Sequence, residues 1–388
     1  MKPKLGDRSL FQRVQAPLYF NCAAVGPLAN PVVHAMHEAV LLQAERGVGA
    51  IPSFVDGVAS CKASFGKLVG AEAADVAFVG STSAGIIGIA TTLDWRAGDR
   101  IVVFRGDFPA NITPWQQAAQ RHGLELVWLD GDAFRTDRAA ALDRLRAELK
   151  RGVRLVALSA VSFRTGERRP VEAVASLCEE AGTELFVDGI QGVGITPLRM
   201  SCGIDYLAVG GHKWMGGPFG TGLLAVAPHR WKQLGGAQAS WLSHEEAHGF
   251  LSGAPGLLRY DRPLQQGPAL FEGGGFNGVG AVGLAAALKL LLELGVDAIF
   301  DHVDELNRHL VAGLTQRGLR TLWGRERSAR GGAVVVELPG RDVGALVAQA
   351  AERGLSVSSP DGRLRLAPHW SLDRAAVDGA LEVLDGLL

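Results

Sequence analysis

A lysine in a glycine-rich loop is the strongest candidate for chemistry in this chain. Lys213 lies in YLAVGGHKWMGGPFGTG, residues 206–222, just after an apolar run and directly after His212. Apolar surroundings disfavour the ammonium ion and favour the neutral amine, which can attack an aldehyde. A surface lysine in a turn is the alternative interpretation, but it does not explain the glycines, tryptophan and methionine around this lysine. We therefore expect Lys213 to form a Schiff base.

A carboxylate and an amide lie upstream, in the stretch ELFVDGIQGVG. Asp188 ends an apolar run, where a lone carboxylate is costly unless a cation meets it. A protonated pyridine nitrogen is such a cation, and Gln191 is spaced to donate to a phenolic oxygen on the same ring. A helix N-cap is the alternative interpretation of Asp188, and it is the better one for that residue taken alone.

Small hydroxylated residues follow an earlier apolar run in FVGSTSAGIIGIA, residues 78–90. A strand that leads through such residues into a helix makes an anion cradle, with Thr82 and Ser83 as candidate phosphate ligands. A simple capping sequence is the alternative. The cradle, the acid and the lysine nevertheless occur in the order that one pyridoxal 5′-phosphate (PLP) needs from one edge of a sheet. We therefore expect PLP as the cofactor.

The elements that must position these residues are strands alternating with helices. Helical apolar spacing at 139–150 and 171–181 precedes two of the strands. This alternation predicts an α/β fold with a mainly parallel, doubly wound sheet, whose ligands lie beyond the carboxyl ends of the strands. Seven short β-rich apolar runs are expected to form the sheet, at residues 76–79, 101–104, 124–129, 155–161, 184–187, 206–209 and 222–226.

The last third of the chain has a different pattern. A stretch rich in Gly, Pro, Ser and His, residues 235–267, is typical of a long connection near a site. After the apolar helix expected at 280–294, the pattern continues as helix, strand, helix, strand and helix to the C-terminus. This predicts a smaller C-terminal α+β domain. We expect a large PLP-binding domain at 18–275 and a small domain made of 1–17 and 276–388.

Bulk composition excludes several classes of function. The 388-residue chain has a formal net charge of −1, so it lacks the basic field that attracts nucleic acid or an anionic membrane surface. The four cysteines form no CxxC pair and have no ligand-like spacing to histidine, so we expect no metal and a reducing compartment. The N-terminus lacks a signal-peptide pattern, and no uncharged apolar run approaches about 18 residues. A cytoplasmic enzyme is expected.

Taken together, these motifs resemble the class V aminotransferase family of fold-type I PLP enzymes. That family includes cysteine desulfurases, isopenicillin N epimerase-like proteins and kynureninase. The resemblance extends from YFNCAAVGPLA at 19–29 to LRLAPHW at 364–370, and the D-G-x-Q and GHKW motifs are its most specific parts. It implies that Lys213 forms the Schiff base, that Asp188 faces the pyridine nitrogen and that Gln191 lies near the phenolic oxygen. It also implies phosphate contacts from Thr82, Ser83 and His212.

The resemblance further implies how substrate and partner are bound. Phe108, in GDFPANITPW, falls where the family stacks an aromatic residue or histidine on the PLP ring, and Asn111 on the same loop and Ala24 would contact the substrate. Arg365 matches the arginine that binds the α-carboxylate, although a solvated arginine at a strand end is the alternative. Gly275 retains backbone donors for the neighbouring subunit's phosphate. A homodimer with active sites at the interface, acting on a small amino acid, is implied.

Departures from the family pattern narrow the reaction. The loop RGLSVSSPDGRLR before Arg365 contains no cysteine, so it cannot form the persulfide of a desulfurase. Phe108 replaces the desulfurase histidine, Phe163 replaces an asparagine, and Gly210 replaces a serine that contacts phosphate. We expect β-elimination, a C–S lyase reaction, on a cysteine-derived substrate. Aminotransfer, epimerisation, kynureninase-like cleavage and a catalytically silent PLP-fold binding protein are the alternatives.

Overall fold

A seven-stranded sheet forms the centre of the molecule. The computed structural model describes residues 2–235, 238–251, 256 and 258–388. The strand order is β2-β8-β7-β6-β5-β3-β4, and every pairing is parallel except those of β8, which runs antiparallel to both of its neighbours. The expected mainly parallel α/β sheet is therefore confirmed. Its strands are β2 Val76–Val79, β3 Arg100–Arg105, β4 Glu125–Asp130, β5 Leu155–Ser159, β6 Glu184–Asp188, β7 Tyr206–Gly210 and β8 Gly222–Val226.

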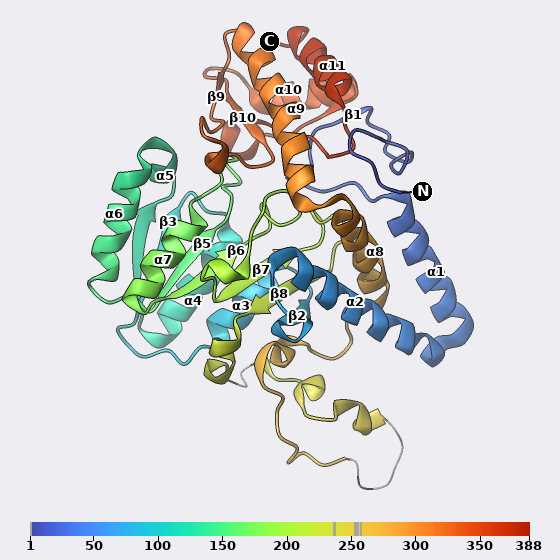
Figure 1. Cartoon of the computed structure of the whole chain (residues 1–388), viewed down its shortest axis with the longest axis vertical. Helices are drawn as coiled ribbons and strands as arrows, with labels where there is room; N and C mark the ends of the chain where they lie inside the picture. The colour runs from blue at the N-terminus through green and yellow to red at the C-terminus, as the bar shows by residue number, and fades with distance from the viewer. Residues whose placement is uncertain (1, 236–237, 252–255, 257) are drawn as a thin grey trace.

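Helices cover both faces of this sheet (Figure 1). In β6, Leu185 and Val187 pack into one apolar cluster while Phe186 packs into the other. Strands buried on both faces read as continuous apolar runs, which is why the inner strands were recognisable in the sequence, whereas the edge strand β4 is only partly buried. One face carries α3 Thr82–Thr92 and α4 Thr113–His122. The other carries α2 Ile51–Val69, α6 Arg138–Leu149, α7 Val171–Ala181 and α8 Gly278–Leu294, with α1 Asn30–Arg46 against α8 and the one-turn α5 Ala133–Thr136 before α6.

The C-terminal part is a smaller α+β unit at one end of the molecule, at the top of Figure 1. It has its own apolar cluster and a three-stranded antiparallel sheet of order β12-β10-β9. Its strands are β9 Arg320–Thr321, β10 Val334–Glu337 and β12 Leu364–Leu366, and its helices are α9 Val296–Gln316, α10 Val343–Glu352 and α11 Arg374–Asp385. The short strand β1, Leu18–Tyr19, pairs in parallel with β11, Leu355–Ser356.

The expected domain boundaries, after residues 17 and 275, stay a prediction. Two packing facts bear on them: β1 pairs with the C-terminal unit, and α8 packs against α1 and α2. Within the described residues no individual helix has the length and apolar character of a membrane span, and α8 with α9, bent by 78°, is the one pair that meets both criteria jointly.

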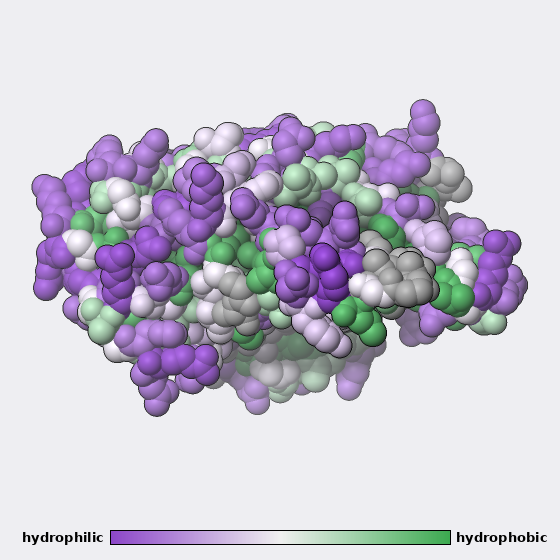
Figure 2. Space-filling model, turned by 90° about the horizontal axis from the view of Figure 1, so that it is seen from below, coloured by the Kyte–Doolittle hydropathy of each residue, from purple (hydrophilic) through white to green (hydrophobic). Residues whose placement is uncertain are grey.

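The connection expected at 235–267 lies at the opposite end from the C-terminal unit (Figure 1). Its described residues form short 3₁₀ helices, among them η7 Trp241–Ser243 and η8 Ala247–Leu251, while 236–237, 252–255 and 257 lie outside the described residues. Seen from this end, hydrophobic residues occur in small groups between hydrophilic ones (Figure 2). Leu258 and Tyr260 are 70% and 86% exposed, so this segment presents apolar side chains to solvent.

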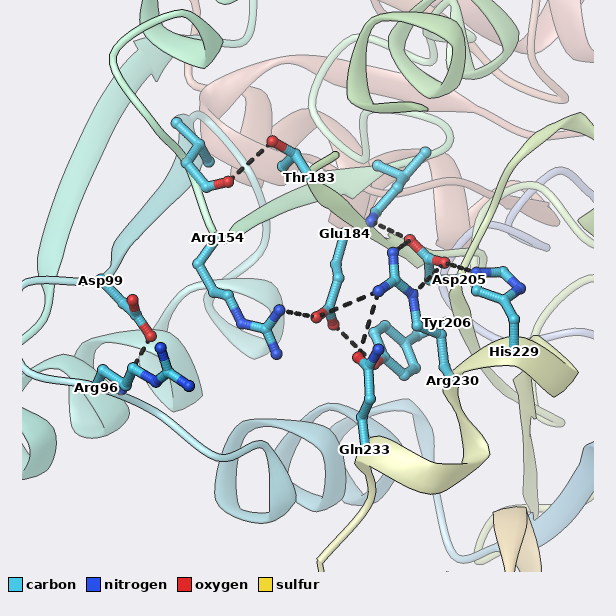
Figure 3. A network of polar contacts seen from close by, with 12 residues as sticks. Arg96, Asp99, Arg154, Thr183, Glu184, Asp205, Tyr206, His229, Arg230 and Gln233 are labelled. Carbon is cyan, nitrogen blue, oxygen red and sulfur yellow. Dashed lines mark hydrogen bonds and ion pairs between the residues drawn. The ribbon is translucent and has the colours of Figure 1, made fainter. Parts of the chain in front are cut away.

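A network of charges closes the amino edge of the sheet, where β6 and β7 begin (Figure 3). Glu184 is fully buried, accepts a 2.7 Å hydrogen bond from the Tyr206 hydroxyl and forms ion pairs with Arg154 and Arg230. Arg230 also donates from Nε to Asp205 at 2.7 Å. Burial raises the pKa of Glu184, while the hydroxyl and the two arginines lower it. Each buried carboxylate here therefore has a cationic partner.

Candidate active site

The N-terminus of α3 forms one wall of the site. Ser81 caps this helix by accepting a 3.1 Å hydrogen bond from the Ala84 amide. The amides of Thr82 and Ser83, in the first turn, have no acceptor within the helix. Thr82 Oγ1 is buried and has no hydrogen-bond partner. Amides and an unsatisfied hydroxyl at a helix N-terminus suit an anion such as phosphate.

Asp188 lies at the carboxyl end of β6 and is 3% exposed. Its carboxylate accepts a 3.0 Å hydrogen bond from the Ile190 amide. Burial raises the pKa of Asp188 to about 6, against lowering contributions from that amide and from Lys213. The residues that follow form turns rather than a helix, so N-capping does not explain this carboxylate. A buried carboxylate of this kind suits a cationic partner such as a pyridinium nitrogen.

Lys213 follows β7 and lies close to Asp188 on the same sheet edge. Burial lowers the pKa of Lys213 to about 8, and Arg365 lowers it further while Asp188 raises it. The Lys213 Nζ lies 5.8 Å from the centroid of the Phe108 ring. A substantial fraction of the amine is therefore neutral near pH 8 and able to act as a nucleophile or base.

The lysine loop is held by the N-terminal segment and by an aromatic contact. The Gly26 amide donates to the His212 carbonyl at 2.8 Å, and a Cβ on Gly26 would lie 2.1 Å from the Lys213 carbonyl oxygen. Only glycine allows this approach. The His212 ring stacks on Phe219, with centroids 4.5 Å apart and planes at 18°. The orientation of the loop is thereby fixed on both sides.

Arg365 comes from β12 of the C-terminal unit and is 6% exposed. Its Nε donates to Ser358 Oγ at 3.2 Å and its Nη1 donates to the Phe163 carbonyl at 3.1 Å. Burial lowers the pKa of Arg365 to about 10. No acidic side chain among the described residues lies within ion-pair distance of it, so this buried guanidinium is available for a carboxylate from outside the chain.

These residues meet in one cavity of about 550 Å³. Since it is bounded by the carboxyl ends of β2, β6 and β7 and by β12, it joins the large sheet to the C-terminal unit. The residues expected from the sequence that line it are Ala24, Thr82, Ser83, Phe108, Asp188, Gln191, His212, Lys213 and Arg365.

Two expected residues do not line this cavity. Asn111 is fully buried beneath the Phe108 loop, where it donates to Asp107 at 3.3 Å and accepts from the Trp115 indole at 3.2 Å. Its polar atoms are thus used inside the protein, and a direct substrate contact lacks support. Gly275, which has a φ of +72°, lies outside the cavity of its own chain. Its expected contact is with a neighbouring subunit and stays a prediction.

Gln191 is engaged more fully than the sequence suggested. Its Nε2 donates to the Ala23 carbonyl at 2.8 Å, and its Oε1 accepts from the Trp214 indole at 2.9 Å. One amide hydrogen remains for a group in the cavity. Gln191 therefore ties the N-terminal segment to the lysine loop while it faces the cavity.

A buried pair under the Phe108 loop was missed from the sequence. Asp107 accepts from the amide and the hydroxyl of Ser159, at 3.1 and 2.9 Å, and lies 2.5 Å from Arg169, whose side chain is fully buried. This anchors the loop that presents Phe108. Asp107 follows a strand, which was a signal, but its partner is distant in sequence and could not be identified.

Gly210 stands where the family carries a serine that contacts the phosphate, and the space beside it is filled by another hydroxyl. A Cβ at this position would lie 3.1 Å from Thr82 Oγ1 and 3.3 Å from the His212 ring. The hydroxyl of Thr82 thus occupies the space beside residue 210, where the family carries a serine.

The fold and this cavity define a PLP-dependent enzyme of fold type I. The unpartnered Thr82 hydroxyl, the buried Asp188 and the amine of Lys213 fit the phosphate, the ring nitrogen and the aldehyde of PLP. The model of the class V aminotransferases matches residues 18–372, and the chain belongs to this family, whose cofactor is PLP.

Similar curated proteins are cysteine desulfurases. A probable cysteine desulfurase from Pyrococcus abyssi is 28% identical over 84% of this chain and 79% of that protein. One from Chlamydia trachomatis is 31% identical over 72% of this chain and 66% of that protein, and the cysteine desulfurase of an Enterobacter species is 31% identical over 69% and 63%.

Solved structures confirm the fold. The apo cysteine desulfurase from Thermococcus onnurineus matches 100% of this chain and 99% of its own, with a TM-score of 0.86 and 24% identity. The cystine C–S lyase C-DES, in complex with its product cysteine persulfide, matches 97% of this chain and 99% of its own, with a TM-score of 0.87 and 22% identity. At such identities the match establishes the architecture.

Proposed function

We propose that this enzyme catalyses β-elimination on a cysteine-derived amino acid and breaks the bond between Cβ and sulfur. The observation that carries the proposal is the wall of the cavity beside Arg365. Ser358 lies there, and none of the described residues that line the cavity is a cysteine. Sulfur has no protein thiol to accept it, so it leaves on a small molecule. The cystine C–S lyase among the structural neighbours supports this reaction class.

The net reaction balances without a further reagent other than water. R–S–CH₂–CH(NH₃⁺)–COO⁻ and water give R–SH, pyruvate and ammonium. The α-hydrogen and the Cβ–S bond are lost, the electrons of the Cα–H bond form a double bond to Cβ, and the leaving sulfur gains a proton. Hydrolysis of the resulting unsaturated amine gives pyruvate. Neither an oxidant nor a reductant is required.

The residues of the cavity divide this work. PLP, when bound, withdraws electrons from the substrate α-carbon. Asp188 keeps a proton on the pyridine nitrogen, and the α3 N-terminus with Thr82 and Ser83 holds the phosphate. Arg365 binds the α-carboxylate. Lys213, whose pKa burial lowers to about 8, takes the proton from the α-carbon.

We also propose a cytoplasmic homodimer. The exposed Leu258 and Tyr260 on the 235–267 segment, and Phe219 at 64% exposure beside His212, give apolar surface for a second copy to cover. Gly275 follows the same segment and would bring its backbone to the partner's phosphate site. All four cysteines are free thiols, which agrees with a reducing compartment.

Incubation of the PLP-loaded enzyme with cystine and S-substituted cysteines tests the reaction. Equal amounts of pyruvate and released thiol or persulfide are expected. Conversion of the cofactor to its amine form, with a keto acid that still carries sulfur, would instead identify an aminotransferase. Alanine formed together with a protein-bound persulfide would identify a desulfurase.

Alkylation separates the lyase from the desulfurase independently. Cys22, Cys61 and Cys178 are buried, and burial raises the pKa of Cys61 and Cys178 to about 12. Cys202 lies outside the cavity. Iodoacetamide under native conditions should therefore leave the elimination rate unchanged. If the enzyme lost activity at the same rate as iodoacetamide alkylated one of its cysteines, the proposal would be contradicted.

A further inference from the structure

A second cavity lies between the large sheet and the C-terminal unit. It measures about 640 Å³ and is lined by α5, by the start of α6, by Glu167 and by β9 with the loop that follows it. Four arginines and two glutamates line it, so the cavity is rich in cationic groups. None of its lining residues lines the Lys213 cavity, so it is a separate site.

Three of these arginines have no acidic partner. Arg320 pairs with Glu337 at 3.4 Å, but Arg135, Arg138 and Arg325 lie within ion-pair distance of no carboxylate in the described part of the chain. Arg138 is the first residue of α6, where the helix dipole disfavours a cation. Helix stability therefore does not account for a basic residue there.

Buried polar atoms in this cavity also lack partners. Arg135 Nε and Trp323 Nε1 are donors that water does not reach, and neither has an acceptor. The Arg330 guanidinium lies over the Trp323 ring at 4.1 Å from its centroid, so the ring is held in place. Buried donors without acceptors are costly, so a shift of the Arg135 and Trp323 side chains that brings these N–H groups to an oxygen atom in the cavity would be favourable.

Glu167 does not cancel the positive charge of the cavity. This side chain is 2% exposed and its Oε1 has no hydrogen-bond partner. Burial raises the pKa of Glu167 to about 7, although Arg169, Arg135 and Arg138 lower it. At neutral pH its carboxyl group is partly protonated, and when protonated it can donate a hydrogen bond to an oxygen in the cavity.

We propose that this cavity is a binding site for a small multivalent anion, either a phosphate ester or a polycarboxylate. Its oxygens would accept from the guanidinium groups of Arg135, Arg138 and Arg325, which form no ion pair with the described residues, although Arg138 also donates to Ser328 Oγ at 3.4 Å. Two-pronged contacts to guanidinium favour these anions over chloride. The anion joins α5 and α6 to the C-terminal unit.

A tight turn links this site to the catalytic cavity. The Ser162 amide donates to the Glu167 carbonyl at 2.8 Å, and the Phe163 carbonyl between them accepts from Arg365. Glu167, which lines the anion site, and Phe163, which accepts from the proposed substrate-binding Arg365, therefore belong to the same turn. The expected consequence is a lower KM for the amino acid when the anion is bound. This consequence rests on the proposed function, whereas the binding itself does not.

Calorimetric titration of the PLP-loaded enzyme tests the binding, with inorganic pyrophosphate and citrate as separate probes. PLP fills the phosphate cradle at α3, and the variants described below distinguish the second cavity from the Arg365 site. We expect saturable binding of at least one probe with a Kd of about 1 mM or below, and at least a tenfold weaker Kd in the double variant Arg135→Gln/Arg138→Gln. The tighter probe identifies phosphate or carboxylate chemistry.

Two control variants locate the bound anion. Arg144 lies on the exposed side of α6, so Arg144→Gln lowers the net charge of the same helix and should leave the Kd unchanged. Arg365→Ala should also leave it unchanged, because that arginine lies in the other cavity. Absence of saturable binding of both probes, an unchanged Kd in the double variant, or loss of binding in Arg365→Ala would each overturn the proposal.

Discussion

The two edges of the central sheet bury charge in opposite ways. At the amino edge, Glu184 is enclosed by Arg154, Arg230 and the Tyr206 hydroxyl (Figure 3). At the carboxyl edge, Asp188 is 3% exposed and Lys213 is half-buried, yet neither forms an ion pair with another described residue. The same strands, β6 and β7, supply both arrangements.

A partner within the chain distinguishes the buried charges that stabilise the fold from the buried charges that bind a ligand. Buried charges that are paired within the chain need nothing from outside it, and removing one partner leaves an uncompensated charge. Buried charges without partners lower stability and are retained where a bound group completes them. The carboxyl edge therefore depends on PLP and substrate for its missing partners, and the amino edge does not.

The largest expected effect follows the loss of the carboxyl-edge lysine. Lys213→Ala should lower the elimination rate by about 10⁴-fold, because the group that moves the α-proton is removed. It should also abolish retention of PLP on the protein after borohydride reduction. Because the ammonium is unpaired, unfolding of the apoprotein should change little. Lys289→Ala, at an exposed position on α8, serves as the control. Retained borohydride labelling in Lys213→Ala would assign the linkage to another lysine.

At the amino edge, we expect a substitution to lower stability and to leave the bound cofactor unaffected. Glu184→Ala leaves Arg154 and the Tyr206 hydroxyl without their acceptor and removes one of the two carboxylates beside Arg230. It should lower the free energy of unfolding by about 3 kcal/mol, measured by urea titration. The visible spectrum of the bound cofactor should not change. Glu180→Ala, on the exposed face of α7, should have an effect of less than about 0.5 kcal/mol. Equal stability of the Glu184 and Glu180 variants would remove the distinction between the edges.

Loss of the unpaired arginine tests substrate binding without disturbing the cofactor. Arg365→Ala should raise the KM for the amino acid by about 100-fold, because a buried charge-to-charge contact is lost. The PLP spectrum should stay intact. Arg365→Lys should recover only part of the loss, since an ammonium lacks the two-pronged geometry. If KM is unchanged in the alanine variant, another group binds the carboxylate.

Two threonines, one at each edge, give the smallest and most closely matched comparison. Thr183 Oγ1 donates to the Val153 carbonyl at 2.8 Å, whereas Thr82 Oγ1 has no partner. Thr183→Val should lower apoprotein stability by about 1 kcal/mol, while Thr82→Val should leave it unchanged and weaken PLP binding by about tenfold. The reverse pattern in the two titrations would show that the phosphate is held elsewhere.

The carboxyl edge was predictable because it is built from local patterns. Each strand is an apolar run, and the residue that follows it is fixed at the sheet edge, so Asp188, Lys213 and Thr82 were placed together from chain order alone. The family resemblance added Arg365 and Phe108, which come from distant segments.

Side-chain partners at long range were not predictable. Asn111 has the residue type of a substrate ligand, but the Asp107 carboxylate and the Trp115 indole use both ends of its amide. Arg169 reads as a surface arginine in ERRP, yet it is fully buried against Asp107. The partners of Asn111 and Arg169 depend on which loops pack together in the folded chain. Residue spacing in the sequence does not predict that packing.

The pairing of β1 with β11 sets the time at which the site is completed during synthesis. Leu18 and Tyr19 pair with Leu355 and Ser356, and Ala23 and Ala24, which line the cavity, follow directly. Strand β1 is therefore synthesised long before β11, the strand with which it pairs. Contacts so distant in sequence form late because loop closure precedes them. Tight retention of PLP is thus expected only after β11 has been synthesised, and a nascent chain that ends before β11 would be distinguishable by its failure to keep the cofactor.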